Sequence, residues 1–320
     1  MEKIDILLAT YNGEKYLKEQ LDSILKQSYS EFRLLISDDC STDKTRDILN
    51  EYSKKDARIQ LHFQKKNLGV IKNFEFLLKN VKNKYYMFSD QDDIWKENKI
   101  EKSIKVLETT NSDLVYTDLQ VVDSKLNVIY ESYWKKKGIY KKIKKYNNFE
   151  SLYLNNFVTG CTILSKSKYI EDILPLPTNS IYVLHDYWVA LIISQNHKMT
   201  YIEEPLIKYR QHKNNKIGSK RRTDQIKDID EIRNLFIKVK KEHFQVFIEH
   251  EEKFIDSKIR ELNQKALKYY EMLENKKNIN FRGWGLFFKL YKYEEFIYKM
   301  ENFLILNIPV LVKMVYKFKK

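Results

Sequence analysis

The sequence predicts an α/β fold with a doubly wound, mostly parallel sheet, followed by a C-terminal region of long helices. Three observations lead to this prediction. Apolar runs of strand length alternate with amphipathic segments between residues 5 and 118, and four of these runs end in polar residues. Beyond about Lys220 the pattern changes to long helical stretches rich in Lys, Glu and Tyr. Alternating strands and helices favour parallel strands joined by crossover helices.

The expected strands and helices follow in order along the first part of the chain. The strands are DILLA (5–9), FRLLIS (32–37), IQLHF (59–63), YYMFS (85–89) and LVYTD (114–118). Continuous apolar runs of this length are typical of strands covered on both faces. We expect the first helix to open at Gly13 and the second to be capped by Ser41 or Thr42. A third helix follows Gly69, and a charged helix spans about Lys96 to Glu108.

Residues 119–215 show a less regular pattern. Short strands are expected around TILS (162–165) and MTYIEEPLIKYR (199–210), with a helix, DYWVALIIS (186–194), between them. We therefore expect one domain over residues 1–218 and a helical C-terminal extension over residues 219–320.

The composition is that of a globular protein with a basic surface. The chain has 320 residues, of which 43% are hydrophobic and 32% charged, and its formal net charge is +14. Such a charge favours anionic partners, namely nucleotides, nucleic acid or acidic lipid head groups. The two cysteines, Cys40 and Cys161, provide no disulfide framework, so a reducing cytoplasm is expected. No apolar stretch approaches the length needed to span a bilayer.

Three carboxylates, Asp90, Asp92 and Asp93, follow the fourth expected strand. Like charges this close repel each other unless a cation neutralises them or one takes up a proton. Residues two apart on an extended chain project to the same side, so the D-x-D spacing suits Mg²⁺ or Mn²⁺ with a bound phosphate. The alternative is an acidic turn that caps the helix after Trp95. No G-x-G-x-x-G follows the first strand and no G-x-x-x-x-G-K-[ST] occurs, which argues against a dinucleotide dehydrogenase or a P-loop enzyme.

Polar residues also follow the first three expected strands. Thr10 and Tyr11 follow the first strand, Asp38 and Asp39 the second, and Asn67 the third. Ligands of doubly wound sheets bind beyond the carboxyl ends of the strands, so these residues predict a shared binding rim. A carboxylate at this rim can accept from a pyrimidine N–H or from ribose hydroxyls, and Tyr11 could stack on a base. Helix capping and core packing are the structural alternatives.

Seven segments occur in an order that resembles a known enzyme family. They are ILLATYNGEKYLKEQLDSILKQSY, SDDCSTDKT, NLGVIKNFEFLL, SDQDDIW, NNFVTGCTIL, LHDYWVALI and YRQHKNN. Between about Ile4 and Asn215 the chain resembles the inverting family-two glycosyltransferases of the GT-A fold. Within that family it is similar to the bacterial rhamnosyltransferase branch of surface-polysaccharide assembly. One departure is Cys40, where many relatives carry glycine, and this loosens the prediction of the turn there.

The resemblance implies a GT-A catalytic domain and a role for each matching residue. The nucleotide pocket would contain Thr10, Tyr11, Glu14, Asp38, Asp39 and Asn67. Asp90 and Asp92 would form the D-x-D pair, with Asp92 the direct ligand of Mn²⁺ or Mg²⁺ and His212 a further ligand. Arg210 would lie near the diphosphate, and Asp186 would be the catalytic base. The donor or acceptor sugar would meet Asp93, Trp95, Asn156, Thr159, Gly160, His185 and Gln211.

Elementary electrostatics supports the role of Asp186. It opens the helix at 186–194, and a helix N-terminus favours a carboxylate over a carboxylic acid. We therefore expect Asp186 to keep a low pKa and to be ionised at neutral pH. An ionised carboxylate can take the proton of an acceptor hydroxyl as its oxygen attacks the anomeric carbon. A plain helix cap is the structural alternative.

The resemblance also implies the partners. The donor would be dTDP-L-rhamnose, with a UDP-hexose or UDP-N-acetylhexosamine as the alternative, and the acceptor would be a saccharide or a lipid-linked saccharide. Segments 281–296 and 300–320 are basic and aromatic, and would contact the inner face of the cell membrane or a second copy of the chain. A nucleic-acid-binding protein is a competing class, but acid stands where phosphate would have to bind. A catalytically inactive binding module is disfavoured by the presence of Asp92 and Asp186.

Overall fold

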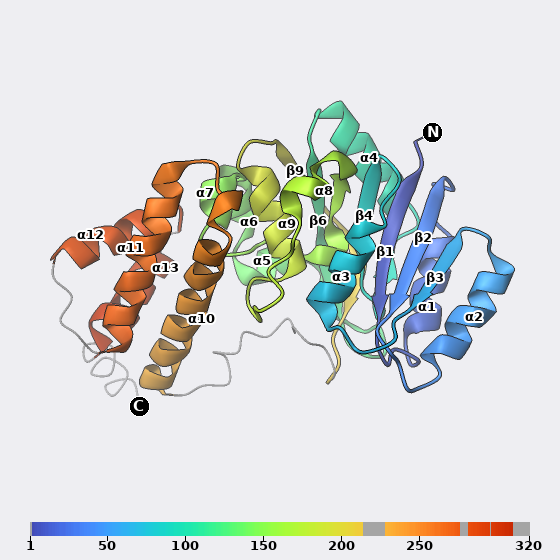
Figure 1. The fold of residues 1–320 in the computed structure, drawn as a ribbon, viewed down its shortest axis with the longest axis horizontal. Coiled ribbons are helices and arrows are strands. Elements are labelled where there is room, and N and C mark those ends of the chain that lie inside the picture. The colour runs from blue at the N-terminus through green and yellow to red at the C-terminus, as the bar shows by residue number, and fades with distance from the viewer. Residues whose placement is uncertain (1, 214–227, 276–280, 295, 310–320) are drawn as a thin grey trace. The chain divides into compact units, whose positions relative to one another are not determined.

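The computed structural model describes residues 2–213, 228–275, 281–294 and 296–309 (Figure 1). By its internal contacts the chain forms two compact units. The first comprises Met1–Ile143, Asn156–Thr178 and Leu184–Ser219. The second comprises Lys144–Asn155, Asn179–Val183 and Lys220–Lys320. The helical unit thus includes two short segments from the middle of the chain in addition to the C-terminal region.

A mixed sheet organises the first unit. Its strand order is β3-β2-β1-β4-β8-β6-β9-β5, and β7 pairs with β6. The strands are β1 Ile4–Thr10, β2 Phe32–Asp38, β3 Ile59–Phe63, β4 Tyr85–Ser89, β5 Ile94–Trp95, β6 Leu114–Val122, β7 Val128–Tyr130, β8 Leu164–Lys166 and β9 Met199–Arg210. Strands β1 to β4 pair in parallel, as the alternation predicts. Strand β8 is antiparallel to both β4 and β6, so the sheet is mixed beyond β4.

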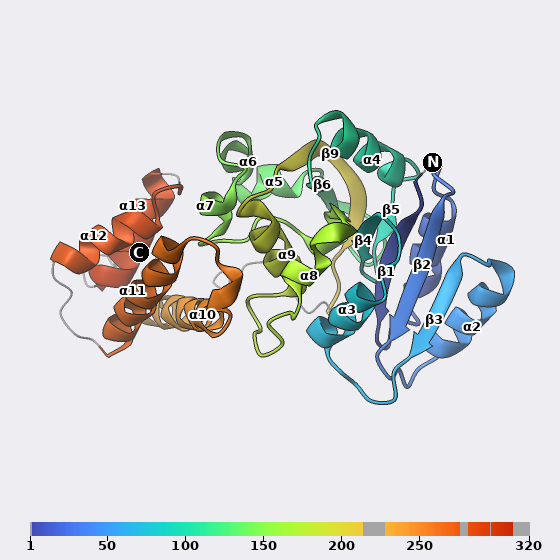
Figure 2. The ribbon, with the colours of Figure 1, turned by 45° about the horizontal axis from the view of Figure 1, so that its top comes forward.

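Helices alternate with the strands along the chain. Those that precede residue 213 are α1 Leu17–Leu25, α2 Thr45–Lys55, α3 Val70–Lys79, α4 Lys99–Thr109, α5 Tyr133–Lys137, α6 Tyr140–Lys145, α7 Phe149–Leu152, α8 Ile170–Ile173 and α9 His185–Ser194. Of these, α7 belongs to the second unit. Helix α2 lies beside β3, and α3 lies against β1 and β2 (Figure 2). Helix α4 contacts β6 and β9. Because β1 runs parallel to both β2 and β4, the carboxyl ends of these three strands share one edge of the sheet.

Two helices begin later than the sequence pattern predicts. Helix α1 begins at Leu17 rather than Gly13, because the Gly13 N–H donates to Thr45 Oγ1 at 2.8 Å and holds this segment as a loop. Helix α2 has no side-chain cap. The residues expected to cap it contact Asn12 in the loop after β1 instead. Ser41 Oγ accepts from the Asn12 N–H, and the Thr42 N–H donates to Asn12 Oδ1. The residues expected to start these helices therefore join the two loops to each other.

Two features of the strands were not expected. Strand β6 continues to Val122, beyond the predicted end at residue 118. Strand β5 has only two residues and pairs antiparallel with β9, Ile94 opposite Lys208 and Trp95 opposite Ile207. Two residues carry no periodic signal, so sequence alone could not reveal this pairing. It fixes the chain immediately after the acidic cluster.

An ion pair is buried between β1 and β2. Asp5 lies opposite Arg33 in the strand register, and the Arg33 Nε and Nη2 atoms donate to its two oxygens at 2.7 and 2.8 Å. The backbone N–H groups of Lys82 and Asn83 also donate to Asp5. Burial raises the pKa of Asp5, but Arg33 and these backbone donors outweigh it, so the pKa lies below its ordinary value. This pair joins three segments at the edge of the sheet opposite the predicted rim.

The second unit contains the expected long helices. They are α10 Ile229–Glu249, α11 Ser257–Glu274, α12 Phe281–Leu290 and α13 Phe296–Asn307. Residues 144–155 pack among them, since Tyr153 Oη donates to Asn263 Oδ1 at 2.5 Å and Lys240 Nζ contacts Leu154 O. Within the described ranges, no helix combines the length and apolar character that crossing a bilayer requires. The basic end of the predicted membrane-contacting tail, residues 310–320, lies outside the described residues.

Candidate active site

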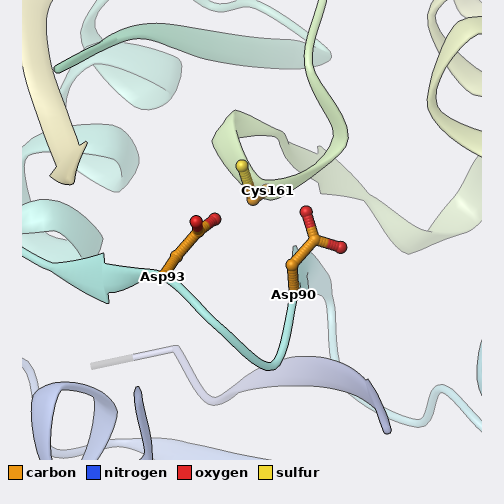
Figure 3. Close-up of side chains that lie close together, drawn as sticks. All are labelled: Asp90, Asp93 and Cys161. Atoms are coloured by element: carbon orange, nitrogen blue, oxygen red, sulfur yellow. The ribbon is translucent and has the colours of Figure 1, made fainter. Parts of the chain in front are cut away.

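The acidic cluster lies in the loop between β4 and β5. Asp90 and Asp93 point toward Cys161, and one ligand atom from each of the three lies within 4.8 Å of the others (Figure 3). Asp93 and Cys161 are buried, whereas Asp90 is partly exposed. Cys161 belongs to η1, the 3-10 turn Gly160–Thr162. Sequence reasoning missed Cys161 as a neighbour of this cluster, because a lone cysteine has no spacing signal.

The electrostatics of the cluster indicates an excess of negative charge. Burial raises the pKa of Asp90 to about 7, and the carboxylates of Asp92 and Asp186 add to this effect. Burial also raises the pKa of Asp93, again with a contribution from its acidic neighbours. A divalent cation at this place would relieve the repulsion that adds to these shifts.

Asp92 and His212, which the resemblance implies as metal ligands, lie next to each other. His212 Nε2 is 2.9 Å from Asp92 Oδ2, and the imidazole stacks on Tyr16 with the ring centroids 4.8 Å apart. The 2.9 Å distance is that of a hydrogen bond, so the two side chains bind each other in this structure. Carboxylate oxygens and an imidazole nitrogen are also ligand types that a divalent cation accepts, and Asp90 adds another carboxylate to the same loop.

Arg210 holds the acidic loop in place. Its Nε donates to the Asp92 carbonyl oxygen at 2.8 Å, and its backbone N–H donates to Asp93 Oδ1 at 3.1 Å. The guanidinium lies over the Tyr16 ring at 4.5 Å and pairs with Glu19. Arg210 therefore lies beside the acidic loop, and its side chain is buried. Direct contact with a diphosphate stays a prediction.

Gln91, the middle residue of the D-x-D motif, joins the acidic loop to the end of β1. Its side-chain amide accepts from the Tyr11 N–H at 2.8 Å and donates to the Tyr11 carbonyl at 3.0 Å. A Cβ atom at Gly13 would lie 2.3 Å from Gln91 Oε1, so a larger residue there would displace the Gln91 side chain. The central position of D-x-D has no defined residue type, and sequence reasoning did not assign Gln91 a role.

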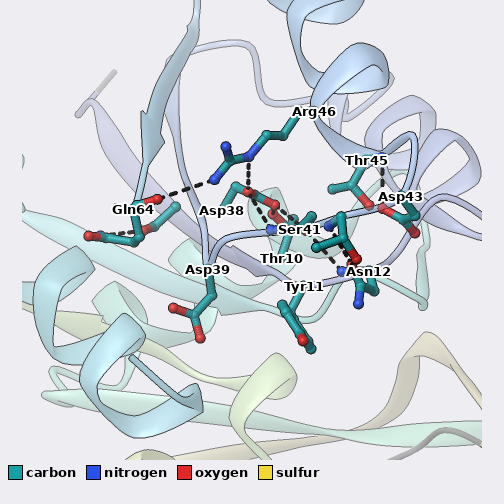
Figure 4. Close-up of polar contacts among 12 residues, drawn as sticks. Thr10, Tyr11, Asn12, Asp38, Asp39, Ser41, Asp43, Thr45, Arg46 and Gln64 are labelled. Carbon is teal, nitrogen blue, oxygen red and sulfur yellow. Dashed lines mark hydrogen bonds and ion pairs between the residues drawn. The ribbon is translucent and has the colours of Figure 1, made fainter. Parts of the chain in front are cut away.

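Asp38 is the centre of a hydrogen-bond network where β1 and β2 end (Figure 4). It accepts from Thr10 Oγ1 at 3.1 Å, from Ser41 Oγ at 2.5 Å and from Arg46 Nε at 2.7 Å. The Asp38 side chain has no exposed surface. It therefore orders the rim from within, and its predicted contact with a base stays a prediction.

Tyr11 and Asp39 lie on the same side of this rim (Figure 4). Tyr11 is 48% exposed, so a stacking partner could reach its ring. The oxygens of Asp39 accept from the N–H groups of Leu68 and Gly69 at 2.6 and 2.9 Å, and Asn67 Nδ2 donates to the Asp39 carbonyl at 3.1 Å. Asp39 and Asn67 thus join the loops after β2 and β3 at the predicted rim.

The loops after β1 and β2 support each other at a second place. Glu14 Oε2 accepts from the Lys44 N–H at 2.9 Å, and the Glu14 N–H donates to Asp43 Oδ2 at 3.1 Å. Cys40, the departure from the family pattern, has a φ angle of 68°. This is the left-handed region, in which glycine has no steric cost and other residues do. The turn is thus formed despite the cysteine.

Asp186 lies in the first turn of α9, but its pKa is not low. Burial raises the pKa to about 6, although the N–H groups of Tyr187 and Gly160 lower it. These groups donate to Asp186 at 2.7 and 3.0 Å. The sequence indicated that Asp186 starts a helix but not that it is buried. Burial raises its pKa by more than the N–H groups of the helix N-terminus lower it. A carboxyl group with this pKa is still mostly ionised at pH 7.

The turn η1 brings Asp186 to the acidic loop. Its first residue, Gly160, donates to Asp186, and its second, Cys161, faces Asp90. The His185 ring stacks on Phe74 with the centroids 3.9 Å apart. Both ring nitrogens are buried and have no hydrogen-bond partner in the part of the chain that is described.

The other predicted substrate residues differ in exposure. Asn156 is exposed and Thr159 partly exposed, next to η1, and Gln211 is partly exposed beyond the end of β9. Trp95 and Asp93 are buried among other residues. Their predicted contact with the substrate stays a prediction.

A cavity of about 630 Å³ lies elsewhere in the first unit. It is lined by Lys96, Gln120, Ile129, Tyr130, Glu131, Ser132, Lys135, Lys136, Glu203 and Pro205. None of these was predicted as a site residue. The cavity therefore does not identify the candidate site, which is defined by the side chains that lie together at the ends of β1, β2, β4 and β9.

The mixed sheet and the acidic loop beyond β4 are features of the GT-A glycosyltransferases. The crystal structure of S. aureus TarS residues 1–349 in complex with UDP has the same fold, with a TM-score of 0.56 and 18% identity over 87% of this chain and 93% of that one. The chain belongs to glycosyl transferase family 2, whose model matches residues 5–174. It is accordingly a glycosyltransferase.

Two curated relatives are similar to this chain. The dTDP-rhamnosyl transferase RfbG of Shigella flexneri is 31% identical over 223 residues, which are 66% of this chain and 74% of that protein. The putative teichuronic acid biosynthesis glycosyltransferase TuaG of Bacillus subtilis is 36% identical over 104 residues, 32% of this chain and 41% of that protein.

Proposed function

We propose that the chain is a metal-dependent, inverting glycosyltransferase that moves one sugar from a nucleotide donor to a hydroxyl of a bacterial surface polysaccharide. The turn η1 carries this proposal, because Gly160 binds Asp186 while Cys161 faces Asp90 and Asp93. One short element thus brings the candidate base beside the candidate metal loop. Direct displacement with inversion needs this proximity, since the base and the leaving group act on one anomeric carbon.

Asp92, His212 and Asp90 would hold the Mn²⁺ or Mg²⁺ ion. A metal bound there would offset the negative charge that grows on the departing nucleoside diphosphate. Arg210 and Gln91 would keep the loop in its binding shape through their contacts with the Asp92 carbonyl and the Tyr11 backbone. Ligands that are held before binding lose less conformational entropy when the ion arrives.

Asp186 would take the proton of the acceptor hydroxyl. The N–H groups of Gly160 and Tyr187 each bind one of its oxygens, which fixes the orientation of the carboxylate. A pKa of about 6 suits a general base, because the group is ionised at neutral pH and yet basic enough to accept a proton. The acceptor oxygen would then attack from the face opposite the diphosphate.

The rim would bind the nucleotide. Tyr11 is exposed and would stack on the base, while Asp38 and Asp39 would order the rim around base and ribose. Glu14 and Asn67 would support the same pocket through the loop contacts already described.

The donor would be dTDP-L-rhamnose, which the name and the 31% identity of RfbG support. A UDP-hexose or UDP-N-acetylhexosamine is the alternative, because few contacts decide the donor in this kind of site. The TuaG likeness supports a surface polysaccharide as the acceptor, and a lipid-linked one would place the enzyme in the cytoplasm at the inner face of the membrane.

A nucleotide-release assay over a panel of nucleotide sugars tests the proposal. We expect dTDP release from dTDP-L-rhamnose in the presence of Mn²⁺ or Mg²⁺ and loss of release when a chelator is added. Release from a UDP sugar alone would select the alternative donor. Unchanged release in the chelator would contradict the metal dependence.

Three variants assign the roles within that assay. Asp92→Asn should abolish the stimulation by metal, and Asp186→Asn should lower transfer by about 10²–10⁴-fold with little change in nucleotide binding. Asp172→Asn is the matched control, since Asp172 is an exposed acid on α8. Full transfer by Asp186→Asn would show that another residue is the base.

A further inference from the structure

Four polar residues at the start of α1 lie on one side of the helix. Tyr16, Glu19, Gln20 and Ser23 follow the spacing i, i+3, i+4 and i+7, which places them along one helical face. Tyr16 immediately precedes the helix and is buried, and Gln20 has no exposed surface. Buried polar side chains normally bind a partner, so their partners show what this face holds.

The face holds both ends of the acidic loop. Gln20 Nε2 donates to Ser89 Oγ at 2.7 Å, and Ser89 is the residue before Asp90. Beyond the other end of the loop, the Trp95 N–H donates to Ser23 Oγ at 3.0 Å. One helix therefore anchors the loop on both sides.

The same face holds the end of β9 through the Tyr16 ring. The His212 imidazole stacks on this ring, with the centroids 4.8 Å apart and the planes inclined at 30°. The Arg210 guanidinium lies 4.5 Å from the same centroid and pairs with Glu19, about one helical turn further on. Ring stacking and a cation over an aromatic face are both favourable contacts. Tyr16 thus contacts a candidate metal ligand and the residue that holds the acidic loop.

The ring of Tyr16, and not its hydroxyl group, makes these contacts. Tyr16 Oη is buried and has no hydrogen-bond partner within the described ranges. A buried hydroxyl without a partner does not stabilise the fold, so the aromatic surface is what this position supplies. His212 and Arg210 are two residues apart at the end of an extended strand, where side chains project to the same side, so one ring can contact both.

We propose that Tyr16 is a positioning residue whose ring holds His212 and Arg210, so that the imidazole and the acidic loop keep the arrangement that binds the divalent cation. Ligands held in place beforehand lose less conformational entropy on binding. The cation-binding part rests on the proposed function. The contact between Tyr16 and His212 does not, and its contribution to stability can be measured without metal.

Titration with Mn²⁺ alone, followed by the electron paramagnetic resonance signal of the free ion, tests the positioning. Tyr16→Leu removes the ring and keeps an apolar side chain, and it should raise the Kd of Mn²⁺ about tenfold, which is about 1.4 kcal/mol. Tyr16→Phe keeps the stacking surface and should leave the Kd within about twofold. Unchanged binding by Tyr16→Leu would overturn the proposal, as would a loss in Tyr16→Phe as large as that in Tyr16→Leu.

Tyr169→Leu is the matched control. Tyr169 also stacks on a histidine, His197, with the centroids 4.1 Å apart, and Lys168 Nζ lies 4.7 Å from its ring centroid. Its hydroxyl donates to Asp113 at 2.7 Å, just before β6, and this is the end of the sheet opposite the acidic loop. Removal of this ring should leave the Kd of Mn²⁺ unchanged. A rise as large as that in Tyr16→Leu would overturn the proposal, because any lost stack would then weaken the site.

A double-mutant cycle on thermal unfolding, without metal, tests the contact itself. Tyr16→Leu and His212→Ala should each lower Tm, and the double variant should lose less than the sum of the two, because both single variants remove the same stack. Additive losses would overturn the proposal. A wild-type protein that binds no Mn²⁺ would refute the proposed metal site, whereas this cycle would still decide whether Tyr16 holds His212.

Glu19→Gln provides the test if Tyr16→Leu does not fold. The Glu19 side chain is half exposed, so this variant should fold. Loss of its pair with Arg210 should loosen the guanidinium on the Tyr16 ring and raise the Kd of Mn²⁺ about threefold. An unchanged Kd would then overturn the proposal.

Discussion

At the scale of single residues, Gly160 determines how closely η1 approaches α9. A Cβ atom at this position would lie 3.1 Å from Asp186 Cβ and 3.1 Å from His185 Nε2. Contacts of this length force the neighbouring groups to move. Since the Gly160 N–H also orients the Asp186 carboxylate, the smallest possible side chain at Gly160 should displace the candidate base.

We therefore expect Gly160→Ala to lower kcat about tenfold or more while the KM of the donor changes little, because a tenfold loss needs only about 1.4 kcal/mol. Steady-state kinetics with a donor and acceptor would measure this. Gly285→Ala is the control, since a Cβ atom there has no neighbour within 4 Å. An unchanged kcat for Gly160→Ala would mean that the position of Asp186 tolerates this displacement.

The pKa of Asp186 predicts the acid limb of the pH profile. Burial raises this pKa to about 6, so protonation of the base begins as the pH falls below 7 and dominates below 6. A protonated carboxyl group cannot accept the proton of the hydroxyl, and the rate should fall about tenfold per pH unit below 6. The measurement needs saturating metal, because the pKa of Asp90 lies near 7. A flat profile between pH 7 and 5 would exclude Asp186 as the base.

At the scale of elements, the Asp5–Arg33 pair joins β1 to β2 and to the segment before β4. Removing one member of a buried pair leaves the other without a partner, so Asp5→Asn should lower the free energy of unfolding by about 3–5 kcal/mol. Asp56→Asn, which breaks the partly exposed Asp56–Arg58 pair, should cost about 1 kcal/mol or less. Urea unfolding of both variants at pH 7 would measure the two losses.

The same pair predicts a dependence on pH. The pKa of Asp5 is lower in the folded state than its ordinary value of 3.8. The stabilisation is therefore complete above pH 3.8 and is lost as the pH falls through the lower, folded-state pKa. The difference between the wild type and Asp5→Asn should thus shrink in strongly acidic solution. A difference that stays constant there would assign the loss to packing rather than to charge.

The sequence predicted the elements that have their own periodic pattern. The parallel strands β1 to β4 and helices α3, α4 and α9 fall close to their expected ranges, because each carries a long apolar face. Strand β5 and turn η1 have two and three residues, and only tertiary pairing produces them. The antiparallel part of the sheet depends on β8, whose partners lie far away in the sequence.

The candidate site shows the same division. The resemblance implied that Asp92 and His212 bind one metal ion; their side chains lie 2.9 Å apart at the nearest atoms, and the shared ion stays a prediction. Gln91 and Cys161 were not expected to lie at this site. Their significance depends on burial and on neighbours that no spacing rule encodes, and burial is also the reason for the wrong expectation of a low pKa at Asp186.

At the scale of the whole molecule, the predicted ligand contacts belong to one unit. The rim, the acidic loop, η1 and the end of β9 all lie in the first unit, whereas α10 to α13 lie in the second. Binding of a nucleotide and a metal should therefore stabilise the backbone of the first unit at these places.

Hydrogen–deuterium exchange with and without Mn²⁺ and dTDP should detect this difference. We expect slower exchange in peptides that contain residues 10–14, 38–46, 90–95 and 160–162, because bound ligand suppresses local opening of the loops that hold it. Peptides from α10 and α11 should exchange at an unchanged rate and serve as the internal control. Protection centred on α10 and α11 would place the ligand in the helical unit, and protection nowhere would mean that this nucleotide and metal do not bind.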